Sequence, residues 1–133
     1  MPGETNLTQL LRTMQPELQP GRYVFCTVDS LLGFDVSEAI GLFREREGWT
    51  LILPQAAADR LQLPYSYVAA WLTLTVHSAL EAVGLTAAFA QALARAGVSC
   101  NAVAAYYHDH IFVAERDAER ALQVLRQLAA TAS

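Results

Sequence analysis

The stretch from His77 to Val113 constrains the fold of this chain more than any other part. It contains, in order, a strand end, a loop with Gly84, a helical pattern closed by Gly97, and two strands joined by a tight turn. A helix that begins after such a loop presents unpaired backbone N–H groups, which attract anionic groups such as a carboxylate. The segment therefore predicts a binding site built from the backbone.

The second half of the chain has the clearer pattern. Apolar residues alternate from Val68 to Val76 as in a strand with one apolar face, and a helical stripe follows from Leu85 to Ala96. Two strands, Val98 to Tyr106 and His110 to Val113, are joined by a turn, and a last helix has its apolar face from Ala118 to Leu128. This half is predicted to be βαββα, one strand short of the ferredoxin-like βαββαβ unit.

The first half repeats this order more faintly. Asn6 is expected to cap a helix that contains Leu7, Leu10, Leu11 and Met14 and ends at Pro16. The elements predicted after it are a strand over 22–28, a helix from the capping box of Asp35 and Glu38 to Gly48 with an apolar stripe of Val36, Ala39, Ile40 and Phe43, a strand over 49–53 and a brief helix over 56–61.

The shared order indicates a degenerate duplication, with an N-terminal unit over 1–64 and a C-terminal unit over 65–133. Neither half has enough strands for a complete sheet. We therefore expect each half to complete its sheet with help from the other, and we expect separated halves to unfold.

Composition limits the functions that are available. The chain has 133 residues, 53% of them apolar, and a net charge of -4, which is enough apolar material for a core without disulfides. Its basic residues are all Arg and form no stripe, so nucleic-acid binding is disfavoured. No apolar run reaches the roughly 20 residues of a membrane-spanning helix, and the N-terminus does not resemble a secretory signal. The two cysteines lie in apolar runs, as expected in the reducing cytoplasm.

Gly84-Leu85, the Ala-rich helix after it, Gly97-Val98 and Asn101 resemble the ACT-domain pattern. Over nearly its whole length the chain is similar to bacterial proteins built from two tandem ACT-like units, with HSALEAVGLTAA and CNAVAAYYHDHIFV as the signature stretches. The resemblance implies an α+β fold of two tandem ferredoxin-like βαββαβ units, with antiparallel sheets and helices on one face. It also implies side-by-side pairing of units and binding of a small effector, usually an amino acid.

The candidate ligand site is centred on the loop before the second-half helix. Backbone N–H groups of Gly84 and Leu85 would bind a carboxylate, Ser78 would be a polar partner, and His77 or Glu81 would meet an ammonium or hydroxyl group. The alternative is that Gly84 only permits the turn and that Ser78 or Glu81 caps the chain entry. The predicted ligand-binding residues are His77, Ser78, Glu81, Gly84, Leu85 and Asn101, the last of which could equally be a plain strand residue.

Catalytic and metal-binding equipment is sparse. His108, Asp109 and His110 could place two imidazoles on one side of an extended segment, as in a transition-metal site. We expect the first and third strands of the unit to run parallel, which would keep His77 away from them, so a polar hairpin is the preferred interpretation. Cys100 has no base beside it in the sequence, and no phosphate-binding loop or paired carboxylates are present. We predict no catalytic residues, no metal and no cofactor.

Three functions are therefore weighed. The leading hypothesis is a non-enzymatic regulatory or sensor protein that binds an amino-acid-like effector, as a homo-oligomer that binds neither nucleic acid nor membrane. The second is a structural or protein-interaction module without a ligand. The third is a small metal-dependent enzyme that uses the histidines.

Overall fold

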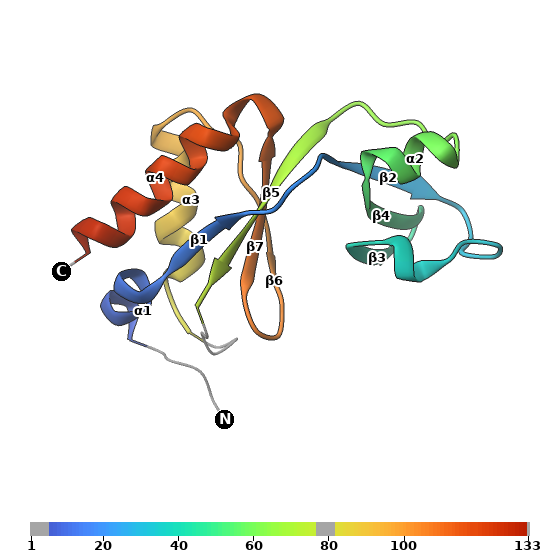
Figure 1. The fold of residues 1–133 in the computed structure, drawn as a ribbon. Helices are drawn as coiled ribbons and strands as arrows, with labels where there is room; N and C mark the ends of the chain where they lie inside the picture. Colours follow the sequence, from blue (N-terminus) through green and yellow to red (C-terminus); the bar gives the residue numbers. More distant parts are fainter. Residues whose placement is uncertain (1–5, 77–81, 133) are drawn as a thin grey trace. The chain divides into compact units, whose positions relative to one another are not determined.

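The computed structural model describes residues 6–76 and 82–132 (Figure 1). The chain forms two compact units that do not follow its two halves. One unit combines Met1–Gln19 with Ala70–Ser133, and we call it the discontinuous unit. The other is the single segment Pro20–Ala69, which we call the continuous unit. The division of the sequence at residues 64 and 65 stays a prediction about the repeat along the chain.

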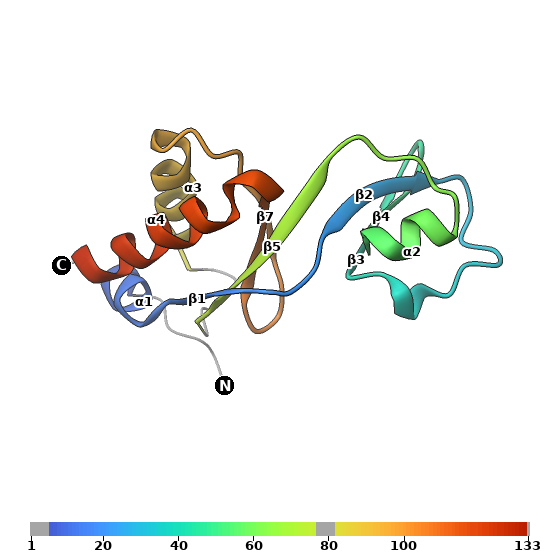
Figure 2. The same ribbon diagram turned by 45° about the horizontal axis from the view of Figure 1, so that its top comes forward.

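The discontinuous unit is a four-stranded sheet with helices on one face (Figures 1 and 2). Its strand order is β1–β5–β7–β6, which is the order of a ferredoxin-like unit whose fourth strand comes from the chain start. Its elements are α1 (Leu7–Thr13), β1 (Gln15–Leu18), β5 (Val68–Thr75), α3 (Leu85–Arg95), β6 (Asn101–Ala104), β7 (Asp109–Ala114), the 3-10 turn η2 (Glu115–Asp117) and α4 (Ala118–Thr131).

The core of this unit lies between the sheet and the helices. The strands and helices each contribute alternate or one-face apolar side chains, as the sequence pattern predicts. Helix α1 contributes as well, because Leu10 is fully buried and Met14 nearly so. The buried set includes Leu10, Met14, Leu72, Leu74, Leu85, Phe89, Leu93, Ile111, Val113, Leu122 and Leu125.

Strand β1 supplies the fourth strand that the second half lacks. It pairs antiparallel with β5, from Gln15 opposite Thr75 to Leu18 opposite Leu72. Pro16, which we expected only to end the first helix, lies in this edge strand, where its missing N–H costs little. The prediction that the second half needs help from the first to complete its sheet is confirmed.

The continuous unit is built around three strands in the order β3–β4–β2. Its elements are β2 (Tyr23–Val28), the 3-10 turn η1 (Val36–Glu38), β3 (Gly41–Glu45), β4 (Gly48–Pro54) and α2 (Gln55–Arg60). The first residues of β5 complete the sheet, since Val68 pairs with Val24 and Ala69 with Tyr23. Helix α2 covers one face, and a small core forms beneath it from Val24, Cys26, Leu51, Leu53 and Ala58.

The helix predicted from Asp35 to Gly48 is wrong. Asp35 does act as a cap, since its carboxylate accepts from the Ser37 N–H at 3.0 Å, but only the short turn η1 follows. The chain then forms β3, which pairs along β4 with Phe43 opposite Thr50. The expected apolar stripe is not buried: Val36 is 53% exposed and Phe43 71% exposed. Pairing with a buried strand has outweighed the helical spacing.

The remaining elements agree with the sequence analysis. Helices α1, α2, α3 and α4 and strands β2, β4 and β5 lie within a few residues of their predicted ranges. The second-half turn is shifted, because Ala105 N–H donates to the His108 carbonyl at 3.0 Å and Asp109 already belongs to β7. The α+β, ferredoxin-like fold class with antiparallel sheets is confirmed.

Candidate functional site

The start of α3 has the backbone geometry that the sequence predicts. Gly84 is the N-cap residue with a φ of 99°, and its carbonyl accepts the first helical bond from Ala88 N–H at 2.9 Å. No side chain among the described residues caps the helix, so the N–H groups of Leu85, Thr86 and Ala87 have no partner within that part of the chain. Three amides at a helix start form a concentrated positive end that suits a carboxylate.

Gly84 also has a structural role. A Cβ at this position would lie 3.1 Å from Leu7 Cδ2 of α1, and a φ of 99° is strained for any residue with a side chain. The simpler explanation, that Gly84 permits the turn, therefore accounts for the glycine at this position. It does not exclude a ligand, because the turn leaves the amides of the first helical turn uncapped within the described residues.

The other predicted site residues divide into two groups. His77, Ser78 and Glu81 lie outside the described residues, so their roles stay predictions. Asn101 begins β6, and its Nδ2 donates to the Phe112 carbonyl at 3.2 Å across the hairpin. Helix α3, about 16 Å long at 1.5 Å per residue, separates it from Gly84, so one copy of the chain does not bring these two residues together.

The hairpin between β6 and β7 turns at the same end of the discontinuous unit as the α3 start (Figures 1 and 2). Across β5 and β7, Trp71 stacks on Phe112 and Thr73 meets His110, so the two strands run antiparallel. The expected parallel arrangement, which would have separated the end of β5 from the start of β7, is wrong. Antiparallel neighbours are what a βαββ order produces when a hairpin joins its last two strands.

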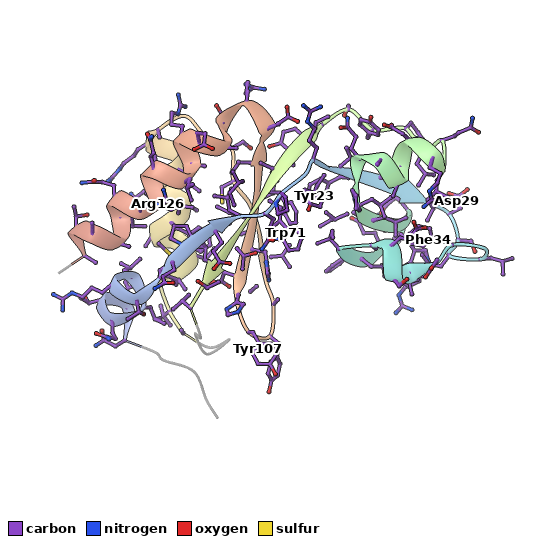
Figure 3. All side chains as sticks on the ribbon, viewed as in Figure 1. Tyr23, Asp29, Phe34, Trp71, Tyr107 and Arg126 are labelled. Carbon is purple, nitrogen blue, oxygen red and sulfur yellow. The ribbon has the colours of Figure 1, made fainter. Side chains whose placement is uncertain are left out.

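Asp109 and His108 are the polar groups at this hairpin end. Asp109 is only 7% exposed, and burial raises the pKa of its carboxyl group, partly offset by the nearby charge of His108. His108 Nδ1 is buried and has no hydrogen-bond partner among the described residues. Tyr106 and Tyr107 are exposed beside them at the hairpin tip, where Tyr107 is labelled in Figure 3.

His110 belongs to a satisfied polar network on the outer face of the sheet. Trp71 Nε1 donates to His110 Nδ1 at 3.1 Å, and because indole nitrogen only donates, Nδ1 must be the unprotonated nitrogen. Thr73 Oγ1 lies 3.1 Å from the same nitrogen and accepts from Gln19 Nε2 at 3.0 Å. Burial lowers the pKa of His110, and the charge of His108 lowers it further. Trp71 is not predicted as this partner from the sequence, although Trp71 and Thr73 share one face of β5 by their period-2 spacing.

The described residues offer little for metal or thiol chemistry. Among them, no three His, Cys, Asp or Glu side chains are grouped as metal ligands. Cys26 and Cys100 are free thiols, and burial raises the pKa of both, which opposes thiolate formation. Of the helices in the described part of the chain, none has the length and apolarity needed to cross a membrane.

Comparisons with known proteins identify the class to which this arrangement belongs. Two ACT domain models match in tandem, one over residues 2–70 and the other over residues 66–127. The chain belongs to the ACT domain family. ACT domains are regulatory rather than catalytic modules.

Solved structures give more particular relatives. A protein of unknown function from Vibrio cholerae, described as a possible transport protein, is 52% identical, with 92% of this chain and 95% of that chain covered and a TM-score of 0.83. The regulatory subunit of aspartate kinase from Thermus flavus shares the fold at 9% identity, covering 86% and 96% of the chains with a TM-score of 0.61. The aspartate kinase of Clostridium acetobutylicum matches at 12% identity with a TM-score of 0.63, and the match covers 94% of this chain and 36% of that chain. No curated protein matches the chain.

Proposed function

We propose that this protein is a non-enzymatic regulatory or sensor protein that binds an amino acid at the start of α3. The observation that carries the proposal is the first turn of α3, where the amides of Leu85, Thr86 and Ala87 are uncapped among the described residues. Membership of the ACT family supports a regulatory role. Two of the structural neighbours, a regulatory subunit of aspartate kinase and an allosteric aspartate kinase, point the same way.

The proposed binding mode assigns each end of a zwitterion to a different group. The carboxylate accepts from the amides of the first helical turn, where the helix dipole adds favourable charge. The ammonium group meets Glu81 or His77, with Ser78 as a further polar partner, as the sequence predicts. Asp109 adds a second carboxyl group at this end of the unit, and its partly desolvated state favours a cationic neighbour.

The proposal includes a homo-oligomer in the cytoplasm. Strand β6 is the edge of its sheet, all four of its residues are exposed, and it carries no charge, proline or bulge to block pairing. By contrast, the edge strand β3 ends in Arg44 and Glu45. A second copy paired at β6 would also supply Asn101 from another chain, which one copy does not bring to Gly84.

Thermal-shift and calorimetric titration of the full chain with the common amino acids and their 2-oxo acids tests this proposal. A ligand at one hundred times its Kd should add about 2.7 kcal/mol to the stability of the folded state. Thr86→Glu should weaken binding, because a carboxylate at an exposed first-turn position competes with that of the ligand. Thr86→Gln, similar in size and uncharged, should bind like the parent. Stabilisation by none of the compounds, or equal binding by both variants, would contradict the proposal.

A protein-interaction module is the second candidate. The exposed, uncharged edge of β6 and the exposed rings of Tyr106 and Tyr107 favour it, because such groups suit pairing with another chain. Size-exclusion chromatography with light scattering separates the candidates when combined with the titrations. A chain that assembles through β6 but is stabilised by no small molecule would support this second function.

A further inference from the structure

A solvent-open hollow of about 530 Å³ lies in the continuous unit, where strand β2 and the segment before β5 separate. It is lined by Phe25, Cys26, Thr27, Thr50, Pro64, Tyr65 and Ser66. The ladder between the two strands joins Tyr23 to Ala69 and Val24 to Val68. The hollow thus lies beside the part of β2 that follows this ladder, in a different unit from the α3 start.

The direction of the β2 backbone at this edge follows from the sheet register. Ile52 of β4 accepts from Ile40 N–H at 2.7 Å, on the side of β4 that faces β3. The N–H and C=O of one strand residue point to the same side, and this side alternates along the strand, so Thr50 also faces β3. Thr27 lies opposite Thr50 in the β2–β4 ladder, and its own N–H and C=O must therefore point away from β4.

Thr27 thus presents a backbone donor and acceptor to the gap. Within the described residues, no backbone hydrogen bond joins Thr27 to the segment Pro64–Ser66 on the far side. Thr27 is also the last outward-facing residue of β2, which ends at Val28. A long extended peptide would find no further residue of this strand to pair with, so the edge suits a ligand with the length of a single residue.

The walls of the hollow are uncharged. The Tyr65 hydroxyl already accepts from Gln55 Nε2 at 3.0 Å and donates to Asp59 Oδ1 at 2.8 Å, so both of its hydrogen-bonding roles are filled. The Thr50 hydroxyl donates to Glu45. Ser66 and Thr27 leave exposed hydroxyl groups, and Phe25 adds a second ring. A charged ligand would lose hydration here without gaining an opposite charge from the lining side chains.

We propose that this hollow binds a neutral, blocked amino-acid group, in which an N–H and a C=O flank one carbon atom, by pairing with Thr27 as an antiparallel strand residue would. The ligand C=O accepts from Thr27 N–H, and the ligand N–H donates to the Thr27 carbonyl. Its side chain lies on the same face of the strand as Thr27, beside the ring of Phe25. This site is independent of the proposed site at α3, both in its location and in its requirement for an uncharged ligand.

The test is an NMR titration of the ¹⁵N-labelled full chain with N-acetyl-L-alanine N-methylamide as the probe. We expect saturable shifts at the Thr27 and Ser66 amides and none at Leu85 to Ala87. Free L-alanine should not shift Thr27, and neither should the probe methylated on its alanine nitrogen, which cannot donate to the Thr27 carbonyl.

Thr27→Pro removes only the outward-facing donor, at a strand position that tolerates proline because its N–H has no ladder partner. We expect the probe to bind this variant about three- to tenfold more weakly, the net effect of one hydrogen bond. Thr27→Ala keeps the backbone donor and should bind as the parent does. Equal binding by the proline variant, equal binding of the methylated probe, or an equal response to free alanine would overturn the proposal. The two probe comparisons remain decisive if the proline variant does not fold.

Discussion

Leu10→Ala should destabilise the discontinuous unit by about 3 kcal/mol. Leu10 is fully buried, and it lies in a core whose other members come mostly from residues after Ala70. Replacing a buried Leu by Ala removes its apolar contacts and leaves a cavity, at a cost of roughly 2–5 kcal/mol. Gln9→Ala is the matched control, because Gln9 lies on the exposed side of the same helix and Ala favours helix formation.

The chain offers a separate fluorescent reporter for each unit. Trp71 lies in β5 after the unit boundary, and Trp49 lies in β4 of the continuous unit. In a Trp49→Phe background, Trp71 alone reports urea unfolding of the discontinuous unit. A loss of 3 kcal/mol should lower the urea midpoint by about 1–3 M, given a typical slope of about 1–3 kcal/mol per molar.

The opposite result is easily recognised. If the second half folds alone and α1 and β1 only pack on its surface, Leu10→Ala should change the urea midpoint reported by Trp71 no more than Gln9→Ala does. That outcome would refute the conclusion that residues at the chain start are part of this core.

Three further predictions concern the α3 end and the sheet face. Gly84→Ala should lower the urea midpoint reported by Trp71 by an amount equivalent to about 1–2 kcal/mol, because a φ of 99° is strained for Ala. The folded-state pKa of His110 is lowered, so its contribution to stability is present above the ordinary value of 6.5 and is lost as pH falls below it. Urea midpoints by circular dichroism from pH 8 to 5 should fall more steeply for the parent than for His110→Gln. The raised pKa of Asp109 gives stability the opposite pH dependence, because stability decreases as pH rises above the ordinary value of 3.8. Asp109→Asn should therefore raise the urea midpoint at pH 7.

The sequence could predict the elements whose pattern is local. The alternation from Val68 to Val76 and the stripe from Leu85 to Ala96 both have a period that matches the element formed. Asn6 caps α1 through the Gln9 amide at 3.0 Å, as its residue type favours. A glycine followed by a helical stripe likewise predicts that a helix begins at Leu85, with Gly84 before it, while binding at these two residues stays a prediction.

What the sequence could not predict depends on contacts between distant residues. Strand β3 forms because Leu42 pairs with Leu51 and Phe43 with Thr50 of β4. The capping signal at Asp35 does not indicate this ladder. The partner of His110 is Trp71, 39 residues earlier in the chain. Its identity depends on the antiparallel register of β5 and β7, whereas the prediction for these two strands is parallel.

The exchange of segments between the two halves also determines how the α3 site must be studied. Leu7 of α1 packs against Gly84, and β1 pairs along the last four residues of β5 before the chain leaves toward α3. A fragment that begins at residue 65 would keep the loop sequence and α3 but would lose the side chain against the N-cap and the neighbouring strand. Loss of binding in such a fragment would therefore say nothing about the amides of Leu85, Thr86 and Ala87. Only substitutions in the full chain, such as the Thr86 pair, can separate the role of these amides from the integrity of the unit that positions them.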